Sequence, residues 1–342
     1  MLNPHMTMEE FKSIYYMEWI HRIWGRIVGL SFIVPAIYFI ARRKVSAPMA
    51  RRILGISALI GFQGFLGWWM VRSGLRDDLF APGSHPRVSQ YRLTAHLGTA
   101  FLTYCAMLWN GLSILRENDL LTNPAKGKKI LDNLQSPQLR LFRKSVAGLF
   151  VIVFCTAMSG GLVAGLDAGL IYNEFPAMGQ GWVPPHSELF SSFYSHREDQ
   201  QDIWWRNMLE NPSLVQLDHR ILATTSFTAI MGLWAYTRFS PTLRRLLPKA
   251  CTKGVHGVVG FAWLQVILGI STLVYLVPLP LASAHQANSL ALLSWILVLG
   301  SRTWIPSRTS QLIVKRLGKS KYQPFKQFTP NRVGLSQLTL AS

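Results

Sequence analysis

Seven apolar stretches, each long enough to cross a lipid bilayer, set the architecture of this 342-residue chain. Each stretch holds about 19 to 23 residues, which as a helix rising about 1.5 Å per residue spans a hydrocarbon core of about 30 Å. The sequence therefore predicts an all-α polytopic membrane protein with seven transmembrane helices. The stretches are residues 23–41, 53–71, 93–114, 145–165, 219–237, 255–277 and 283–301.

Basic residues gather in alternate loops. The four loops that follow the first, third, fifth and seventh stretches carry 25 Lys or Arg, whereas the three loops between them carry 6. Because basic loops stay in the compartment of synthesis, this pattern places the N-terminus outside and the C-terminus inside. The net charge of +19, with only 15% charged residues, fits a membrane protein with basic loops. We therefore expect no nucleic-acid partner.

Two pairs of histidines repeat in matched order in the two halves of the chain. Each histidine stands near the outer end of a predicted helix, so all four lie at one membrane depth. Between the histidines of each pair comes a glutamine, followed four residues later by a glycine. Because imidazoles are costly to bury in lipid, this repeat predicts two similar buried sites. The matched residues are His21, Gln63, Gly67 and His96 in the first half, and His219, Gln265, Gly269 and His285 in the second.

The repeat divides the chain into two domains and a tail. Residues 1–143 hold three of the stretches, and residues 144–305 hold four. The helix that opens the second half has no counterpart before His21, so we expect the first helix of the first half to be missing, as in an N-terminally truncated chain. Residues 306–342 are basic and polar with scattered Pro and Gly, and we expect a disordered tail there.

An acidic residue distinguishes the first histidine site from the second. Thr7 and Glu10 form a capping-box pattern, which predicts a helix from about residue 8 to residue 41. Glu18 and His21 lie three residues apart on this helix and therefore share one side of it. No acid stands three residues before His219. Proton chemistry is therefore expected at the first site, although Glu18 also fits a simple hydrogen bond to His21 or to a neighbouring arginine.

Haem is the ligand that two histidines on facing helices fit best, since they can ligate its iron from both sides. Zinc needs three or four ligands close together, and the three cysteines are isolated in the sequence. Haem also needs apolar walls and basic partners for its propionates. Arg22 and Arg220, which directly follow histidines, are the candidate partners, while Gln63 and Gln265 begin patterns that allow close approach of a helix or ring.

Several motifs resemble one known family, the haem A synthases in their mitochondrial form. The similarity runs from about residue 10 to residue 305. The motifs are EWIHRIWGR at 18–26, QGFLGWWMV at 63–71, AGLDAG at 164–169 with NEFP at 173–176, and QLDHR at 216–220.

This resemblance implies eight helices in two pseudo-symmetric four-helix halves, of which this chain would carry seven. It implies an oxidoreductase that converts a ring methyl of haem O, in two successive oxidations, to the formyl group of haem A for cytochrome c oxidase. His21 and His96 would flank the iron of the substrate haem O, and Glu18 would be the catalytic carboxylate. His219 and His285 would ligate a bound haem b.

The resemblance also implies a location and partners. The chain would lie in the mitochondrial inner membrane, with the haem sites toward the intermembrane space and the C-terminus in the matrix. Electrons would come from a ferredoxin, and contacts with haem O synthase and with a second copy of the chain are further expectations. Two other interpretations stay open, namely a dihaem membrane cytochrome that takes electrons from a quinol, and a haem carrier or chaperone without turnover.

Overall fold

The computed structural model describes residues 7–74 and 87–321, and within them the chain is helical apart from turns, loops and one isolated β-bridge between Met178 and Gly181. The long helices are α1 (Met8–Ala41), α2 (Ala47–Ser73), α3 (Gln90–Thr122), α5 (Arg140–Gly165), α8 (Pro212–Phe239), α10 (Lys249–Val274) and α11 (Leu279–Thr303). The short ones are α4 (Pro124–Gln135), η2 (Pro137–Leu139), η3 (Ala168–Leu170), α6 (His186–Leu189), η4 (Ser192–Tyr194), α7 (Ile203–Glu210), α9 (Pro241–Leu246) and α12 (Ser307–Lys321).

Six of the seven predicted stretches lie wholly within long helices, and the stretch 255–277 runs three residues past the end of α10, which confirms an all-α polytopic membrane protein. Among the described residues, six helical segments are long and apolar enough to cross a membrane. The long helix outside this set is α8, which has 28 residues and carries Asp218, His219 and Arg220 at the start of its apolar part.

The first helix begins and ends where its sequence predicts. The Thr7 side chain accepts a hydrogen bond from the Glu10 backbone N–H, and the Glu10 carboxylate accepts one from the Thr7 N–H at 2.8 Å. This capping box satisfies free donors at the start of α1. The helix continues through Pro35 to Ala41.

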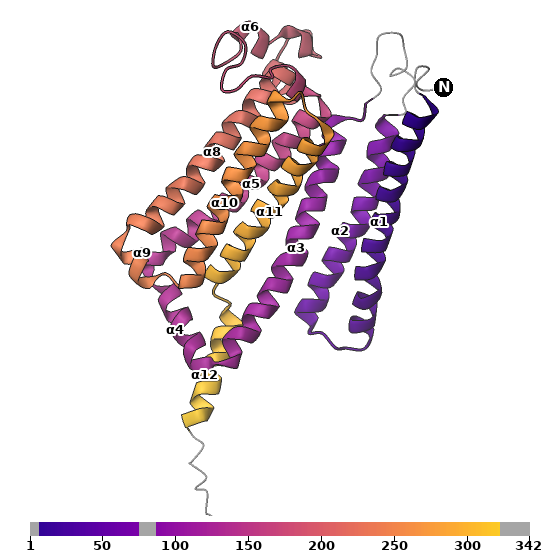
Figure 1. Cartoon of the computed structure of the whole chain (residues 1–342). Coiled ribbons are helices and arrows are strands. Elements are labelled where there is room, and N and C mark those ends of the chain that lie inside the picture. The colour runs from indigo at the N-terminus through magenta and orange to yellow at the C-terminus, as the bar shows by residue number, and fades with distance from the viewer. Residues whose placement is uncertain (1–6, 75–86, 322–342) are drawn as a thin grey trace, which may run out of the picture.

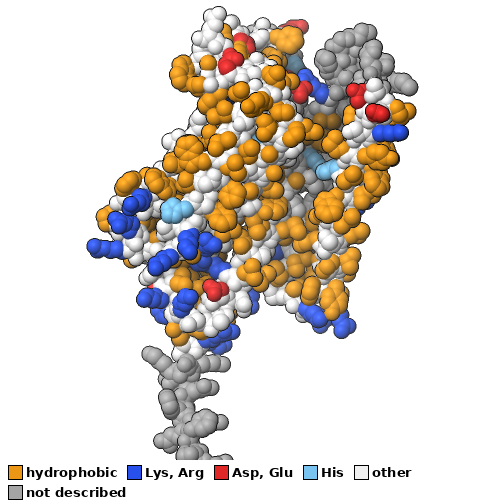
Figure 2. All heavy atoms as spheres, viewed as in Figure 1, with side chains coloured by type: hydrophobic (Ala, Val, Ile, Leu, Met, Phe, Trp, Pro, Cys, Tyr) orange, Lys and Arg blue, Asp and Glu red, His pale blue; other side chains and the backbone are white. Residues whose placement is uncertain are grey.

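The helices α5, α8, α10 and α11 form one bundle, and α3 packs against it through α5 and α11. Helix α2 packs on α3, and α1 packs on α2, so these two helices stand at the side of the molecule in Figure 1. The main core lies among α5, α10 and α11, where Phe142, Val255, Leu293 and Ile296 are almost fully buried. Many large apolar side chains remain exposed on the outer faces of the helices (Figure 2), as expected for surfaces that meet lipid.

Small residues bring α3 and α5 together. A methyl group added at Gly98 would lie 2.8 Å from the Met158 sulfur, and one added at Gly161 would lie 3.2 Å from Leu97. Contacts this short leave no room for a side chain, so the two helices approach as closely as their backbones allow. This contact joins the first three helices to the four-helix bundle.

The two ends of the molecule differ in charge (Figure 2). Lys and Arg side chains gather at the end where α4, α9 and α12 lie, which we call the basic end, and acidic side chains gather at the opposite end. The histidines His21, His96, His219 and His285 all belong to the N-terminal parts of helices that start at that opposite end, which we call the histidine end.

The prediction of a disordered tail is wrong for its first part. Residues Ser307–Lys321 form α12, and Ile313 on this helix is buried against Leu120 of α3 and Leu131 of α4. Ile313 and Leu317 stand one turn apart on the face of α12 that packs on this cluster, so packing rather than composition decides its structure. Residues 322–342 lie outside the described part of the chain.

Candidate functional site

The first histidine pair comes together as predicted. His21 on α1 and His96 on α3 have ring centres 6.5 Å apart, with the ring planes inclined at 76°. Gln63 on α2 donates from Nε2 to the backbone carbonyl of His96 at 2.9 Å, and the same nitrogen lies 3.4 Å from His96 Nε2. Three successive helices therefore supply the first site.

This spacing fits two imidazoles on one metal ion. With metal–nitrogen bonds of about 2 Å and roughly 1 Å from nitrogen to ring centre, two such rings have centres about 6 Å apart. In addition, Nδ1 of His96 and Nδ1 of His285 are both buried and have no hydrogen-bond partner among the described residues. Each of these rings therefore keeps a nitrogen free for another ligand, which is the condition that a metal-binding imidazole must meet.

The second histidine pair repeats the contact between glutamine and histidine. Gln265 on α10 places its Nε2 3.4 Å from Nε2 of His285 on α11, the distance that also separates Gln63 from His96. His219 on α8 lies near enough to His285 for their charges to interact. The duplicated order of residues in the sequence is thus accompanied by a duplicated glutamine–histidine contact in space.

A serine of α5 orients His219. The hydroxyl of Ser159 lies 2.8 Å from His219 Nδ1, which leaves Nε2 of that ring as the nitrogen available to a metal. Sequence reasoning missed Ser159, because a single serine in an apolar stretch carries no pattern. His21 has no such contact among the described residues and is exposed.

Three of the imidazole rings lie close to the Cα atom of a glycine on a neighbouring helix. A methyl group added at Gly67 would meet Cε1 of His96 at 3.0 Å, and one added at Gly269 would meet Cε1 of His285 at 2.8 Å. Gly160 stands in the same relation to His219, at 3.2 Å. The glycine four residues after each glutamine therefore leaves room for the imidazole ring, because it has no side chain.

The two glutamines differ in what holds their amide oxygens. Asn288, one turn after His285, donates 2.7 Å to Gln265 Oε1 and is itself buried. The corresponding residue after His96 is Thr99, and Gln63 Oε1 is buried and has no hydrogen-bond partner within residues 7–74 and 87–321. The glutamine of the second site is therefore held by one more polar side chain than the glutamine of the first.

Glu18 pairs with the arginine that follows His21. Its carboxylate lies 2.5 Å from Arg22 Nη2, and both side chains are about half exposed. The structure thus brings Glu18 and Arg22 together beside His21, which was one of the two alternatives left by the sequence. At the corresponding place before His219 stands Gln216, which is buried and donates 2.9 Å to the carbonyl of Tyr172.

Arg220 holds a loop. Its two terminal nitrogens donate to the backbone carbonyls of Tyr172, Glu174, Pro176 and Ala177, at 2.9 to 3.4 Å. This loop includes the NEFP motif, so one guanidinium explains why that motif lies beside the second site. A role of Arg220 or Arg22 toward haem propionates stays a prediction.

The segment between α5 and α8, residues 166–211, folds over the histidine end, and we call it the cap (Figure 1). Two buried asparagines hold it together. Asn207 accepts a hydrogen bond from the Ser191 N–H at its side-chain oxygen and donates one from its side-chain nitrogen to the Ser191 carbonyl. Asn211 donates a 2.7 Å hydrogen bond to the carbonyl of Glu188. A sequence of mixed composition without periodicity gave no sign of this order.

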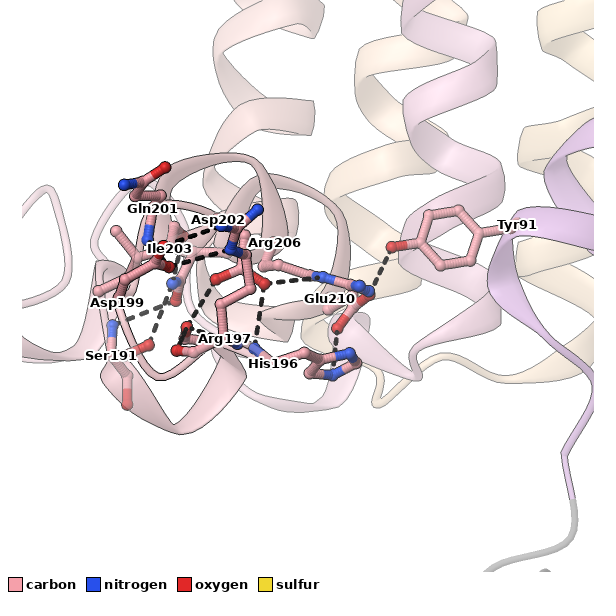
Figure 3. A network of polar contacts seen from close by, with 12 residues as sticks. Tyr91, Ser191, His196, Arg197, Asp199, Gln201, Asp202, Ile203, Arg206 and Glu210 are labelled. Carbon is pink, nitrogen blue, oxygen red and sulfur yellow. Dashed lines mark hydrogen bonds and ion pairs between the residues drawn. The ribbon is translucent and has the colours of Figure 1, made fainter.

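Figure 3 shows how the cap reaches the first half of the chain. Glu210, at the end of α7, accepts a 2.7 Å hydrogen bond from Tyr91 on α3, forms an ion pair with Arg206, and lies 3.5 Å from His196. Arg206 also lies 3.4 Å from Asp202. The cap is therefore tied to the helix that carries His96.

No three His, Cys, Asp or Glu side chains meet in a metal-binding group anywhere in the described ranges. Each site instead presents two imidazoles with apolar and glycine surroundings. Such a pair suits a metal whose remaining ligands come from a planar macrocycle.

Fold and site together define a polytopic membrane protein with two matched pairs of histidines on facing helices. The chain belongs to the COX15-CtaA family, described as cytochrome oxidase assembly proteins, whose model matches residues 1–297.

Named relatives agree with this family. The chain is 46% identical over 321 residues to heme A synthase COX15 of Saccharomyces cerevisiae, covering 94% of this chain and 65% of the relative. It is 48% identical to heme A synthase COX15 of Homo sapiens, covering 86% and 64%. It is 45% identical to a heme A synthase-mitochondrial ferredoxin fusion protein of Schizosaccharomyces pombe, covering 88% and 49%. The chain thus spans about half to two thirds of the length of these relatives.

Proposed function

We propose that this chain carries the catalytic machinery of a haem A synthase, which oxidises a ring methyl of haem O in two successive steps to the formyl group of haem A. One observation carries this proposal, namely that Glu18 stands three residues before His21 and pairs with Arg22, whereas the place three residues before His219 is taken by the buried amide of Gln216. The names of the relatives support the same activity.

In this proposal His219 and His285 hold a haem b, which supplies one-electron transfer when bound. Ser159 fixes the orientation of the His219 ring through Nδ1, and Gln265 with Asn288 borders the His285 ring. The glycine beside each ring lets it lie close to its neighbouring helix. These residues keep the second pair in one arrangement.

The first pair would receive the substrate. His21 and His96 would flank the iron of haem O, and Glu18 would exchange a proton near the methyl group under oxidation. Arg22 holds the Glu18 carboxylate through their ion pair and so limits its orientations. The exposure of His21 leaves this pair accessible to an incoming haem.

The test is haem A formation in membranes of a host that makes haem O. Glu18→Gln keeps the shape and removes the carboxylate, so we expect haem A to fall by roughly 100-fold or more relative to haem O. Glu9→Gln is the matched control, since Glu9 is exposed on the same helix and contacts neither histidine. Haem is extracted and separated by chromatography, and absorption spectra check that the haem b complement is unchanged.

Other outcomes separate the alternatives. Undiminished haem A in Glu18→Gln would remove the catalytic role of the carboxylate. Two equivalent haem spectra without any haem A would favour a dihaem cytochrome, whereas haem binding without redox turnover would favour a carrier.

Location and electron supply belong to the same proposal. We infer a mitochondrial inner-membrane protein with its histidine end toward the intermembrane space and its basic end in the matrix, in keeping with the distribution of Lys and Arg. A ferredoxin is the proposed electron donor, supported by the name of the Schizosaccharomyces pombe relative. Binding of an acidic ferredoxin to the basic end should weaken steeply as salt rises.

A further inference from the structure

Asn173, the first residue of the NEFP motif, joins two segments of the chain through its side-chain nitrogen. It lies in the loop of residues 169–177, which we call the strap. Nδ2 donates 2.8 Å to the carbonyl of Gly169 and 3.0 Å to the carbonyl of Leu273, so both hydrogens of the amide group are used. Leu273 belongs to the last turn of α10, where backbone carbonyls have no hydrogen-bond partner further along the helix. The strap therefore caps the end of α10.

The turn that the strap contacts has an unfavourable backbone conformation. Leu276 and Val277 follow α10 with φ of 61° and 55°, in the left-handed region that residues with a branched Cβ, such as valine, rarely adopt. Such conformations persist where the surrounding structure holds them. A methyl group added at Gly169 would lie 3.0 Å from Cγ2 of Val277, so the strap packs on this turn in addition to binding the carbonyl before it. Asn173 and Gly169 thus support one strained turn.

This turn decides how α11 leaves α10. Residues 275–278 are the whole connection between the two helices, and His285 stands in the second turn of α11. Because short connections between antiparallel helices adopt only a few conformations, the backbone angles of this turn set the direction and rotation of the helix that follows. The position of His285 against Gln265 and Gly269 of α10 therefore depends on the turn.

The strap is also attached to α8, the helix that carries the other imidazole of this pair. Gln216 donates 2.9 Å to the carbonyl of Tyr172, and Arg220 donates 2.9 Å to the carbonyl of Glu174. These two carbonyls belong to the residues directly before and after the asparagine. The two donors stand on either side of His219 in the sequence of α8. One loop therefore connects the helix of the first imidazole with the turn that leads to the second.

We propose that Asn173 is a positioning residue of the second histidine pair. By holding the α10–α11 turn against a strap that is bound to α8, it fixes the His285 ring relative to the His219 ring. Groups beyond the ligands commonly orient metal-binding imidazoles in this way. The effect on a bound haem rests on the proposed function, whereas the hold on the turn belongs to the chain itself.

Asn173→Leu tests the proposal, because it keeps the approximate size of the side chain and removes both donors without changing the charge. The variant and the unmodified chain are purified in full length with haem b bound. The electron paramagnetic resonance signal of a low-spin ferric haem depends on the angle between its two axial imidazole planes. We expect the lowest-field resonance of the second-site haem to shift or broaden, and haem transfer to apomyoglobin to become severalfold faster. An unchanged resonance would overturn the proposal.

Hydrogen exchange of the haem-free chain measures the hold on the turn directly. The backbone N–H groups of Leu276 and Val277 donate to the carbonyls of Leu273 and Thr272 at 3.1 and 2.8 Å. Both should exchange severalfold faster in Asn173→Leu, and equal exchange in the two chains would contradict the proposal. Lack of haem b in the unmodified chain would instead contradict the proposed function, and the exchange rates would still decide the role of Asn173.

Asn207→Ala is the matched control. It removes a buried amide that holds the cap at Ser191 and that makes no hydrogen bond to the strap. The cap should loosen around Ser191, while the resonance of the second-site haem and the exchange of the α10–α11 turn stay as in the unmodified chain. An equal shift in the two variants would assign the effect to the cap in general and overturn the role of Asn173.

Leu276→Gly provides a rescue, which also covers the case in which Asn173→Leu fails to fold. Leu276 is 64% exposed, and glycine adopts a φ of 61° without steric cost, so the turn should no longer need support. Combined with Asn173→Leu, this change should restore the resonance of the unmodified chain and slow the exchange of the turn. A double variant that behaves like Asn173→Leu alone would contradict the role of the turn.

Discussion

The hydroxyl of Tyr91 on α3 donates a 2.7 Å hydrogen bond to the carboxylate of Glu210 at the end of α7. Tyr91 stands on the helix that carries His96, whereas Glu210 belongs to the cap that precedes the His219 helix. This contact therefore adds a polar link between the two halves of the chain at the histidine end. It also gives the cap a fixed position above the helices.

Tyr91→Phe should loosen the cap without unfolding the bundle. Removing the hydroxyl takes away a hydrogen bond to a charged group, worth about 1.5 to 3 kcal/mol in favourable cases. Glu210 keeps its ion pair with Arg206, so the loss should lie at the lower end of that range. Hydrogen exchange across residues 203–210 should quicken. Tyr194→Phe is the control. Equal exchange rates in the two variants would show that the Tyr91 contact does not stabilise the cap.

The cap should also open at high pH. Burial, together with the hydrogen bond that Tyr172 donates to Glu188, raises the pKa of Tyr172 to about 12. Because the folded pKa lies above the unfolded value of about 10, this contribution is complete below pH 10 and is lost as pH rises through 12. Proteolysis of the cap should therefore accelerate between pH 10 and pH 12. Tyr172→Phe should show no such acceleration of proteolysis. The same acceleration in that variant would mean that another group titrates there.

The glycines beside the imidazoles should tolerate no side chain. Gly269→Ala places a methyl group 2.8 Å from Cε1 of His285 and must displace the ring, so we expect loss of the bis-histidine haem spectrum at the second site. Gly260→Ala on the same helix meets nothing within 4 Å and serves as the control. Haem spectra of membranes that contain each variant make the comparison. An unchanged spectrum in Gly269→Ala would mean that His285 is not held as described.

Asn288 should matter more than its counterpart. Asn288→Ala leaves Gln265 Oε1 without its donor inside the protein, which should cost about 1 to 3 kcal/mol of folding free energy. Thr99→Ala lacks that effect, because Gln63 Oε1 has no partner to lose. Thermal unfolding followed by helical circular dichroism compares the two. A larger loss in Thr99→Ala would contradict the asymmetry between the glutamines.

The helices and the matched histidines could be predicted because both obey simple constraints. Apolar length must match the bilayer, so the seven stretches gave the seven long helices. The capping box of Thr7 and Glu10 placed the start of α1 correctly, since it depends on residues three positions apart. The approach of His21 and His96 followed from their equal depth on two helices of the same half.

The partners of these residues could not be predicted, because they come from distant parts of the chain. Ser159 and Asn288 act through single hydrogen bonds that leave no periodic pattern. The order of α12 depends on burial of Ile313 against Leu120 and Leu131, which composition does not reveal. The cap likewise depends on Asn207 and Asn211, whose amides become structural only when the loop closes around them.

Arg22 and Arg220 occupy equivalent places in the two halves, yet one holds an acid and the other holds a loop. The two halves thus share the positions of their histidines, but the arginines that follow those histidines bind different partners. As a result the copies are no longer interchangeable. If the helices that bear them were exchanged, the cap would lose the arginine that binds its carbonyl groups, and that arginine would stand in a half that has no cap.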